Sequence, residues 1–352
     1  MSITVHQRPG VYSSYDASSI ISGRGAGRLV GLAAINTTAQ AGVPQTITSY
    51  DRAVAAFGSD GDEGMAELIR LALSNGASGV VAVPVADGEG YKAAFETLAG
   101  VEDIALVLCD STAAEVQKAL RDSVAAASDL RRERLCVVAG AADESVEDLI
   151  ARAKELNHER VVLVAPGALD GKGEALSGLC VAAAAAGAIA GEPDPAVPLG
   201  GAELSGLNGL AARLEDKDLD LLILGGVTPV ESVGGVVSVV RGVTTRTSTG
   251  GAPDATWRDL STIRVVDNVI PSLRSALRGR FRRVKNTPQS RGAIRSQVVL
   301  ELENKRAQEI ITSYGDVAVD TDPEDSSRCL VDFSFTVAHG LNQIWLTAHI
   351  TV

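Results

Sequence analysis

Aromatic side chains are scarce in this 352-residue chain, where phenylalanine, tyrosine and tryptophan make up only 3% of the residues. Proteins that bind single-stranded nucleic acid stack bases on such rings, so the scarcity argues against a base-stacking surface. The hydrophobic fraction of 45% comes mainly from alanine, valine and leucine. Small apolar residues suit closely packed layers of helices and strands. The length allows two domains, or three, with a substantial core.

Cysteine and histidine are also few, and neither forms a recognisable site. The four cysteines are widely spaced without a C-x-x-C pair, and Cys109 and Cys136 lie in or at the end of apolar runs. They are predicted to be buried free thiols in a reducing compartment. The four histidines occur singly, without a carboxylate at ligand spacing, and no G-x-S-x-G motif is present. We therefore expect no metal, no cofactor and no enzymatic activity.

No apolar run is long enough to cross a membrane. The most apolar stretch, residues 176–190, has only 15 residues, mostly alanine and glycine, whereas a spanning helix needs about 20. It is predicted to be a buried helix. The first residues lack the apolar segment of a signal peptide. We expect a protein that is made in the cytoplasm and does not insert into membranes.

Positive charge is concentrated in one block. The net charge is −12, but residues 241–306 hold fourteen Lys and Arg against five Asp and Glu, so this block carries +9 and the remainder −21. Within it, Arg274, Arg278 and Arg282 are four apart and would share one helical face. A solvated face that balances the acidic remainder and a docking surface for an acidic protein both remain open. Nucleic acid is less favoured, because aromatics are few and the chain is acidic overall.

Short apolar runs alternate with helical patterns in the first half of the chain. Strands are predicted over 29–33, 80–85, 104–108, 135–138 and 161–164. Helices are predicted over 62–74, 91–98, 112–127 and 145–156. Strands separated by helices of about 10–15 residues indicate βαβ units and a mainly parallel sheet flanked by helices. Two further strands are expected over 221–224 and 236–240, after an ordered surface loop over 191–209.

The composition changes near residue 240, where we expect a domain boundary. Residues 257–277 have helical spacing, with Ile270, Leu273 and Leu277 on the apolar stripe, and Pro271 could kink this helix. A second helix is expected over about 292–303, although 298–300 could also begin a strand. The predicted division is an extended N-terminal arm over 1–22, an α/β core domain over 23–240, a C-terminal α+β domain over 241–340 and a terminal strand over 341–352.

Both ends of the chain are predicted to be strands that pair with other copies. Residues 330–337 and 343–352 alternate apolar and polar side chains, as strands with one buried face do. A shorter β-prone run lies at the N-terminus, before a flexible glycine-rich segment over 23–27. Unpaired strand edges template pairing with another chain. The candidates for pairing between subunits are Ile3, Val5, Ile344, Leu346 and Ile350.

Two glycine-rich segments come close to phosphate-binding motifs. The first segment, residues 23–27, is followed by Arg28 at the position where the motif G-x-G-x-x-G needs its third glycine. A strand also follows this segment, whereas in the motif a strand precedes the glycines. Residues 167–173 follow a strand, as a P-loop does, but have one residue too few between the glycines and no Ser or Thr after Lys172. An α/β enzyme that binds phosphate or nucleotide with the loop from Gly167 to Gly173 is the alternative function.

Three segments carry a more specific pattern through their order along the chain. Residues 8–12 read R-P-G-V-Y, residues 221–246 run from L-L-I-L-G-G-V to V-V-R-G-V-T-T-R-T, and residues 257–267 read W-R-D-L-S-T-I-R-V-V-D. In this order, with two terminal strands, they resemble the tail sheath proteins of contractile phages, including phage-tail-like bacteriocins and contractile injection systems.

The resemblance implies a structural subunit. Sheath subunits form hexameric rings that stack helically around an inner tube, and contraction drives the tube through a target envelope. Each subunit lends terminal strands to its neighbours. The implied partners are other copies of this chain, the inner tube protein, and baseplate and tail terminator proteins, without membrane insertion or direct contact with nucleic acid. The helix with Arg274, Arg278 and Arg282 would face the tube. Assembly would take place in the bacterial cytoplasm, within a virion tail or a phage-tail-like particle.

Overall fold

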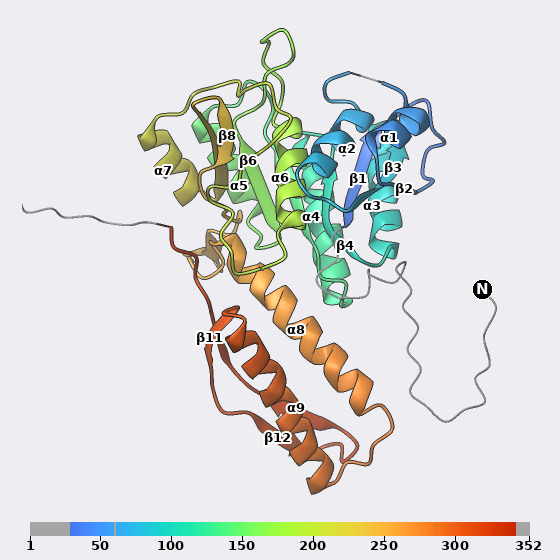
Figure 1. Ribbon diagram of the computed structural model, residues 1–352, viewed down its shortest axis with the longest axis vertical. Helices are drawn as coiled ribbons and strands as arrows, with labels where there is room; N and C mark the ends of the chain where they lie inside the picture. The colour runs from blue at the N-terminus through green and yellow to red at the C-terminus, as the bar shows by residue number, and fades with distance from the viewer. Residues whose placement is uncertain (1–28, 60, 343–352) are drawn as a thin grey trace, which may run out of the picture.

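The computed structural model describes residues 29–59 and 61–342. Figure 1 shows an α/β core from which one long helix, α8 (Leu260–Arg280), runs into a smaller C-terminal unit. We use the name C-terminal unit for residues 265–342, whose side chains pack in a hydrophobic cluster of their own.

The core is built on one eight-stranded sheet with the strand order β2-β3-β1-β4-β5-β6-β7-β8. The inner strands are parallel, and the edge strands β2 and β8 are antiparallel to their neighbours. The strands are β1 (Leu29–Ile35), β2 (Gln45–Ile47), β3 (Gly79–Val85), β4 (Ile104–Cys109), β5 (Leu135–Ala139), β6 (Val161–Ala165), β7 (Val227–Val233) and β8 (Val236–Val239). The predicted mainly parallel sheet is confirmed, including each strand expected between residues 29 and 164.

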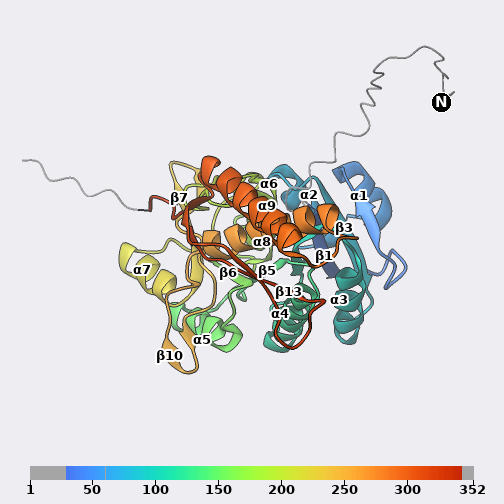
Figure 2. The same cartoon turned by 90° about the horizontal axis from the view of Figure 1, so that it is seen from below.

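Helices cover both faces of the sheet, and Figure 2 shows the two layers on either side of the strands. One face is covered by α1 (Tyr50–Phe57), α2 (Met65–Ser74) and α6 (Leu179–Gly191). The other is covered by α3 (Tyr91–Gly100), α4 (Ala114–Asp129), α5 (Val146–Leu156) and α7 (Asp216–Leu224). Because both faces of the sheet are buried, strands β1, β3, β4, β5 and β6 are apolar throughout rather than alternating.

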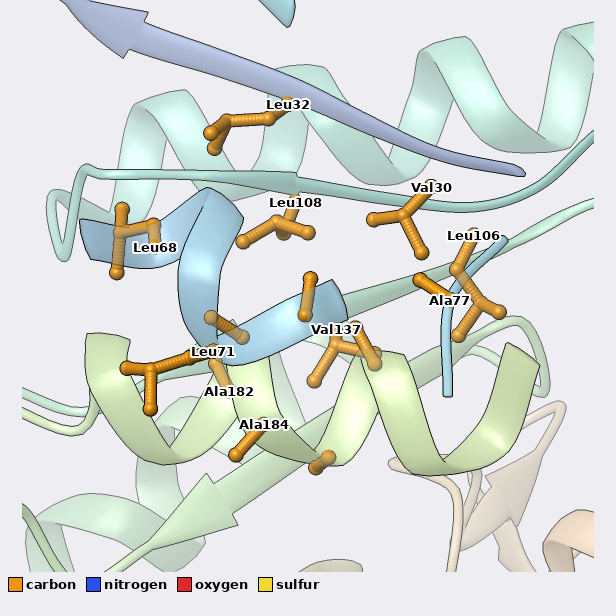
Figure 3. Packing of buried hydrophobic residues seen from close by; sticks show 14 of the residues in the cluster. Val30, Leu32, Leu68, Leu71, Ala77, Leu106, Leu108, Val137, Ala182 and Ala184 are labelled. Carbon is orange, nitrogen blue, oxygen red and sulfur yellow. The ribbon is translucent and has the colours of Figure 1, made fainter. Parts of the chain in front are cut away.

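The predicted buried helix is confirmed as α6. Residues 179–187 are all buried, and Figure 3 shows Ala182 and Ala184 of α6 packed beside Leu71 of α2. The two helices approach so closely that a Cβ atom on Gly187 would lie 2.3 Å from the carbonyl oxygen of Ala72. This close contact explains why most residues of α6 are alanine or glycine, since larger side chains would separate the helices.

Replacing Gly187 with alanine is expected to destabilise the fold. The new methyl group would overlap the backbone of α2, and overpacking of this kind costs about 1–3 kcal/mol of unfolding free energy. Gly292→Ala is the matched control, because a Cβ atom there meets nothing within 4 Å. The control is expected to gain about 0.5–1 kcal/mol from helix propensity. Urea unfolding followed by circular dichroism measures both, and equal midpoints would contradict this account of the packing.

The strand predicted over 221–224 is wrong, because these residues form the last turn of α7. Leu219 and Leu222 are buried, whereas Leu221 and Leu224 are exposed, which is helical spacing. A short apolar run does not distinguish a strand from a helix by itself. The strand follows after two glycines, as β7, and the predicted strand near 236–240 is confirmed as β8.

Helix α8 connects two hydrophobic clusters. Its first residues, Leu260 and Ile263, belong to the cluster under α2 and α6, while Val265, Val269 and Leu273 pack against α9 (Pro288–Ala307). The predicted stripe is confirmed at Leu273, which is buried, and at Leu277, which packs on the same cluster, but Val269 is buried in place of the predicted Ile270. The helix continues through Pro271. The segment over 298–300, which could have begun a strand, lies within α9.

The C-terminal unit also contains two antiparallel sheets of two strands each. In one, β11 (Ile311–Tyr314) pairs with β14 (Phe335–Val337), and in the other β12 (Ala318–Thr321) pairs with β13 (Cys329–Asp332). The predicted strand over 330–337 is therefore divided between the sheets. Its alternation is confirmed, because the odd-numbered residues from Val331 to Val337 pack on the cluster while Asp332, Ser334 and Thr336 are exposed. A small hairpin, β9 (Ser248–Thr249) with β10 (Ala252–Pro253), precedes α8.

Candidate assembly surfaces

At the carboxyl ends of β4 and β5, where α/β enzymes usually bind ligands, the polar side chains are engaged in internal contacts. Gln117 is fully buried and donates hydrogen bonds to the carbonyl oxygens of Ser111 and Ala139. Arg152 donates to the side chain of Gln117 and to the carbonyl oxygen of Thr112, and it forms an ion pair with Glu144. These polar groups are occupied in joining α4 and α5 to the sheet.

The loop of the alternative function, residues 167–173, has the wrong geometry for a phosphate cradle. It forms a short hairpin in which the amides of Ala168, Leu169 and Leu176 donate to carbonyl oxygens. The carboxylate of Asp170 accepts hydrogen bonds from the amides of Lys172 and Glu174. A bound phosphate would need these same amides as donors. The following helix begins only at Leu179. The loop is held by its own acidic residue and does not support the enzyme alternative.

An open depression of about 350 Å³ lies at the end of β1, lined by Ile35, Asn36, Thr37, Glu63 and Gly64. The amide group of Asn36 bonds to the carbonyl oxygen of Phe57 and to the amides of Thr38 and Ala39, and Glu63 accepts a hydrogen bond from Ser177. These hydrogen bonds hold the surrounding loops together.

The thiols and histidines have structural surroundings. Cys109 and Cys136 are buried and free, as predicted, and so is Cys180; burial raises the pKa of the Cys109 thiol to about 12. His158 is half-buried, and its Nδ1 accepts the amide of Arg160, while His339 is exposed. Within the described ranges, no three His, Cys, Asp or Glu side chains gather as metal ligands. None of the helices described there is long and apolar enough to cross a membrane.

The basic block contains residues with different surroundings. Arg274 forms an ion pair of 2.7 Å with Glu133 of the core, so it is not uncompensated. Arg278 is exposed one turn later, and Arg282 lies beyond the end of α8 at Arg280. The prediction that three arginines share one helical face therefore needs correction, because the helix ends before the third. What remains is a group of exposed cations whose side chains form no ion pair or hydrogen bond within the described part of the chain, and which we call the basic end: Arg278, Arg282, Arg283 and Lys285.

The small sheets of the C-terminal unit present strand edges. Each sheet has two strands, so each strand has one edge without a strand partner in the described part of the chain. Two-stranded sheets are only marginally stable alone, and open edges accept further strands. The described chain ends beside the core, since a Cβ atom on Gly340 would lie 2.6 Å from Pro198. The predicted pairing residues Ile3, Val5, Ile344, Leu346 and Ile350 lie outside the described residues.

Comparison with known proteins identifies both parts of the chain. A family model of the phage tail sheath protein central domain matches residues 85–245, and one of the phage tail sheath C-terminal domain matches residues 252–351. No curated protein sequence matches the chain.

Solved structures match over almost the whole length. The contracted helical sheath of the anti-feeding prophage is 18% identical with a TM-score of 0.74, over 98% of this chain and 99% of that chain. The contracted PVC sheath complex of an extracellular contractile injection system is 14% identical with a TM-score of 0.70, over 99% of both chains. A sheath tail protein from Desulfitobacterium hafniense is 14% identical with a TM-score of 0.69, over 93% of this chain and 100% of that chain. With both domain models in sequence and a shared fold, the chain belongs to the phage tail sheath protein family.

Proposed function

We propose that this protein is the sheath subunit that polymerises helically around an inner tube and contracts to drive the tube through a target envelope. The observation that carries the proposal is the match, over nearly the full length of both chains, to a helical sheath in its contracted state. The internal engagement of the polar side chains at the carboxyl ends of β4 and β5 also favours a structural role. Hexameric rings, and contacts with baseplate and tail terminator proteins, are part of this proposal, as is assembly in the bacterial cytoplasm.

The subunits of this polymer would be joined by exchanged strands. The two-stranded sheets supply open edges, and the terminal segments with Ile3, Val5, Ile344, Leu346 and Ile350 have strand patterning. Main-chain ladders join chains firmly without requiring a particular side chain at each position. The donated strands would therefore hold subunits together while these subunits change their packing during contraction.

The basic end would face the inner tube. Its four cations are exposed and lie at the end of α8 farthest from the core (Figure 1). Like charges repel unless an acidic surface meets them, and exposed pairs contribute only about 0.2–1 kcal/mol each. A contact made of several such pairs holds the tube and can still be released. The proposal now rests on Arg278 and Arg282, together with Arg283 and Lys285, rather than on Arg274.

Electron microscopy of the purified chain tests the proposed function. With its tube protein, the chain is expected to form rods with helical symmetry. The same preparation is run on a sizing column with and without ATP, because the enzyme alternative predicts a small discrete oligomer that retains nucleotide. Such an oligomer, with no rods in the presence of the tube, would overturn the proposed function.

A further inference from the structure

Four charged side chains lie where α8 leaves the core. Arg160 of the core donates two hydrogen bonds to Asp267 of α8, at 2.7 and 3.0 Å. Glu133 of the core pairs with Arg274, at 2.7 Å. Asp267 and Arg274 are seven residues apart, which is two helical turns, so they share one face of α8. We call these four residues the α8 charge cluster: Glu133, Arg160, Asp267 and Arg274.

The cluster is largely shielded from water and balanced in charge. The side chains of Arg160 and Asp267 are each 14% exposed, that of Glu133 is 15% exposed, and that of Arg274 is 34% exposed. The charge of Glu133 also acts on both Arg160 and Asp267. Burial lowers the pKa of Arg160, but the hydrogen bond and charge of Asp267, together with the charges of Glu159 and Glu133, outweigh burial and leave this pKa raised. Burial raises the pKa of Asp267, although Arg160 acts to lower it. Arg160 also donates to the carbonyl oxygen of Arg134, the neighbour of Glu133, so the two pairs are adjacent.

The loop that carries Arg160 also holds the chain on the other side of the junction. Asn157 accepts the amides of Thr247 and Ser248, and the amide of His158 donates to the buried hydroxyl of Thr245. These contacts fix the segment before α8 to the core. Arg160 reaches past that segment to Asp267, which lies beyond the change from the core cluster at Ile263 to the C-terminal cluster at Val265.

Buried ion pairs are poor sources of stability, because desolvation offsets their attraction, and well-packed apolar residues often stabilise as much. A bidentate ion pair fixes the relative orientation of its two partners, since both N–H···O hydrogen bonds are lost when either partner rotates. We propose that the α8 charge cluster is an orientation latch that sets the angle between the C-terminal unit and the core. Its bearing on the polymer rests on the proposed function, but the angle is a property of the single chain.

Charge reversal tests the latch. Glu133→Arg places a third guanidinium beside Arg160 and Arg274, and it is expected to push α8 away from the core. The double variant Glu133→Arg with Arg274→Glu restores an opposite pair and is the matched control. Glu133→Gln, which removes a charge without adding repulsion, replaces the first variant if that one folds poorly.

The readout is the distance between spin labels on the two parts, measured by pulsed electron resonance. Ala93 of α3 and Ala293 of α9 are exposed and are changed to cysteine for labelling. Cys329 is changed to serine because it is partly exposed, while the other three cysteines are buried. The parent is expected to give a narrow distribution, the charge-reversed variant a shifted and broader one, and the double variant a return to the parent.

Two results would overturn the latch. One is an unchanged distance distribution in folded Glu133→Arg or Glu133→Gln, which would assign the angle to other contacts between α8 and the core, such as the hydrogen bond from Arg264 to the carbonyl oxygen of Glu192. The second is a change that the double variant fails to reverse. Because the labels report on the chain without the tube, neither result depends on whether the chain forms a sheath.

Discussion

Removing residues 341–352 is expected to abolish polymerisation while the core remains folded. The described core does not use this segment for its sheet, whose strands all lie between residues 29 and 239. The proposed polymer needs the segment, because it would supply the strand that completes a neighbour's small sheet. Removing residues 1–15 is expected to have the same effect. Electron microscopy shows whether polymers form, and thermal unfolding followed by circular dichroism shows whether the core is still folded.

A point variant separates strand exchange from a general effect of truncation. Ile344→Pro removes a backbone donor from the proposed strand without shortening the chain, and Thr347→Ser is its mild counterpart. The proline variant is expected to polymerise poorly, and the serine variant normally. If either truncation unfolds the core while the rest still forms rods, strand exchange is not the link between subunits.

Changing Arg278, Arg282 and Arg283 to glutamate is expected to abolish assembly on the tube. The change converts three attractive charges into three repulsive ones at the proposed contact. Polymerisation of the chain with itself should persist, since the basic end contributes no strand to the small sheets. Co-assembly with the tube, scored by electron microscopy at low and high salt, is the measurement.

The salt series provides the internal check on this prediction. Exposed pairs are screened over about 8–10 Å at physiological ionic strength, so tube attachment of the parent should also weaken as salt rises. Arg295→Glu is a control from the same basic block, because Arg295 is engaged with the carbonyl oxygen of Val317. Tube-bound sheath of normal appearance from the triple variant would show that the basic end has another role.

Periodicity in the sequence predicted most of the core, because buried parallel strands and amphipathic helices leave direct patterns. The helix predicted over 145–156 is confirmed as α5, where Ser145 is the N-cap and Asp148 is its capping-box partner. The strand was wrongly predicted at 221–224 because a run of four apolar residues fits both the two-residue period of a strand and the 3.6-residue period of a helix. The sequence did not predict the first helix, α1, because its eight residues are too few to show a clear apolar stripe.

The surroundings of the basic residues could not be predicted, since their partners are distant in the sequence. Asp267, one of the five acidic residues within the basic block, pairs with Arg160, which is 107 positions away. Glu133 and Arg274 are 141 positions apart. Neither neighbourhood has a local signal for pairing. Only the approach of α8 to the ends of β5 and β6 brings these charges together, and that approach depends on tertiary packing.

Helix α8 acts as a lever arm whose pivot lies at the edge of the core. From Ile263 to Arg280 it extends about 25 Å, at 1.5 Å per residue. A rotation of about 5° at the pivot would therefore displace the far end by about 2 Å, which is enough to break a salt bridge there. Small differences in packing beside the sheet therefore produce larger displacements of Arg278 and its neighbours. The position of the basic end thus depends on how α8 packs at the edge of the core.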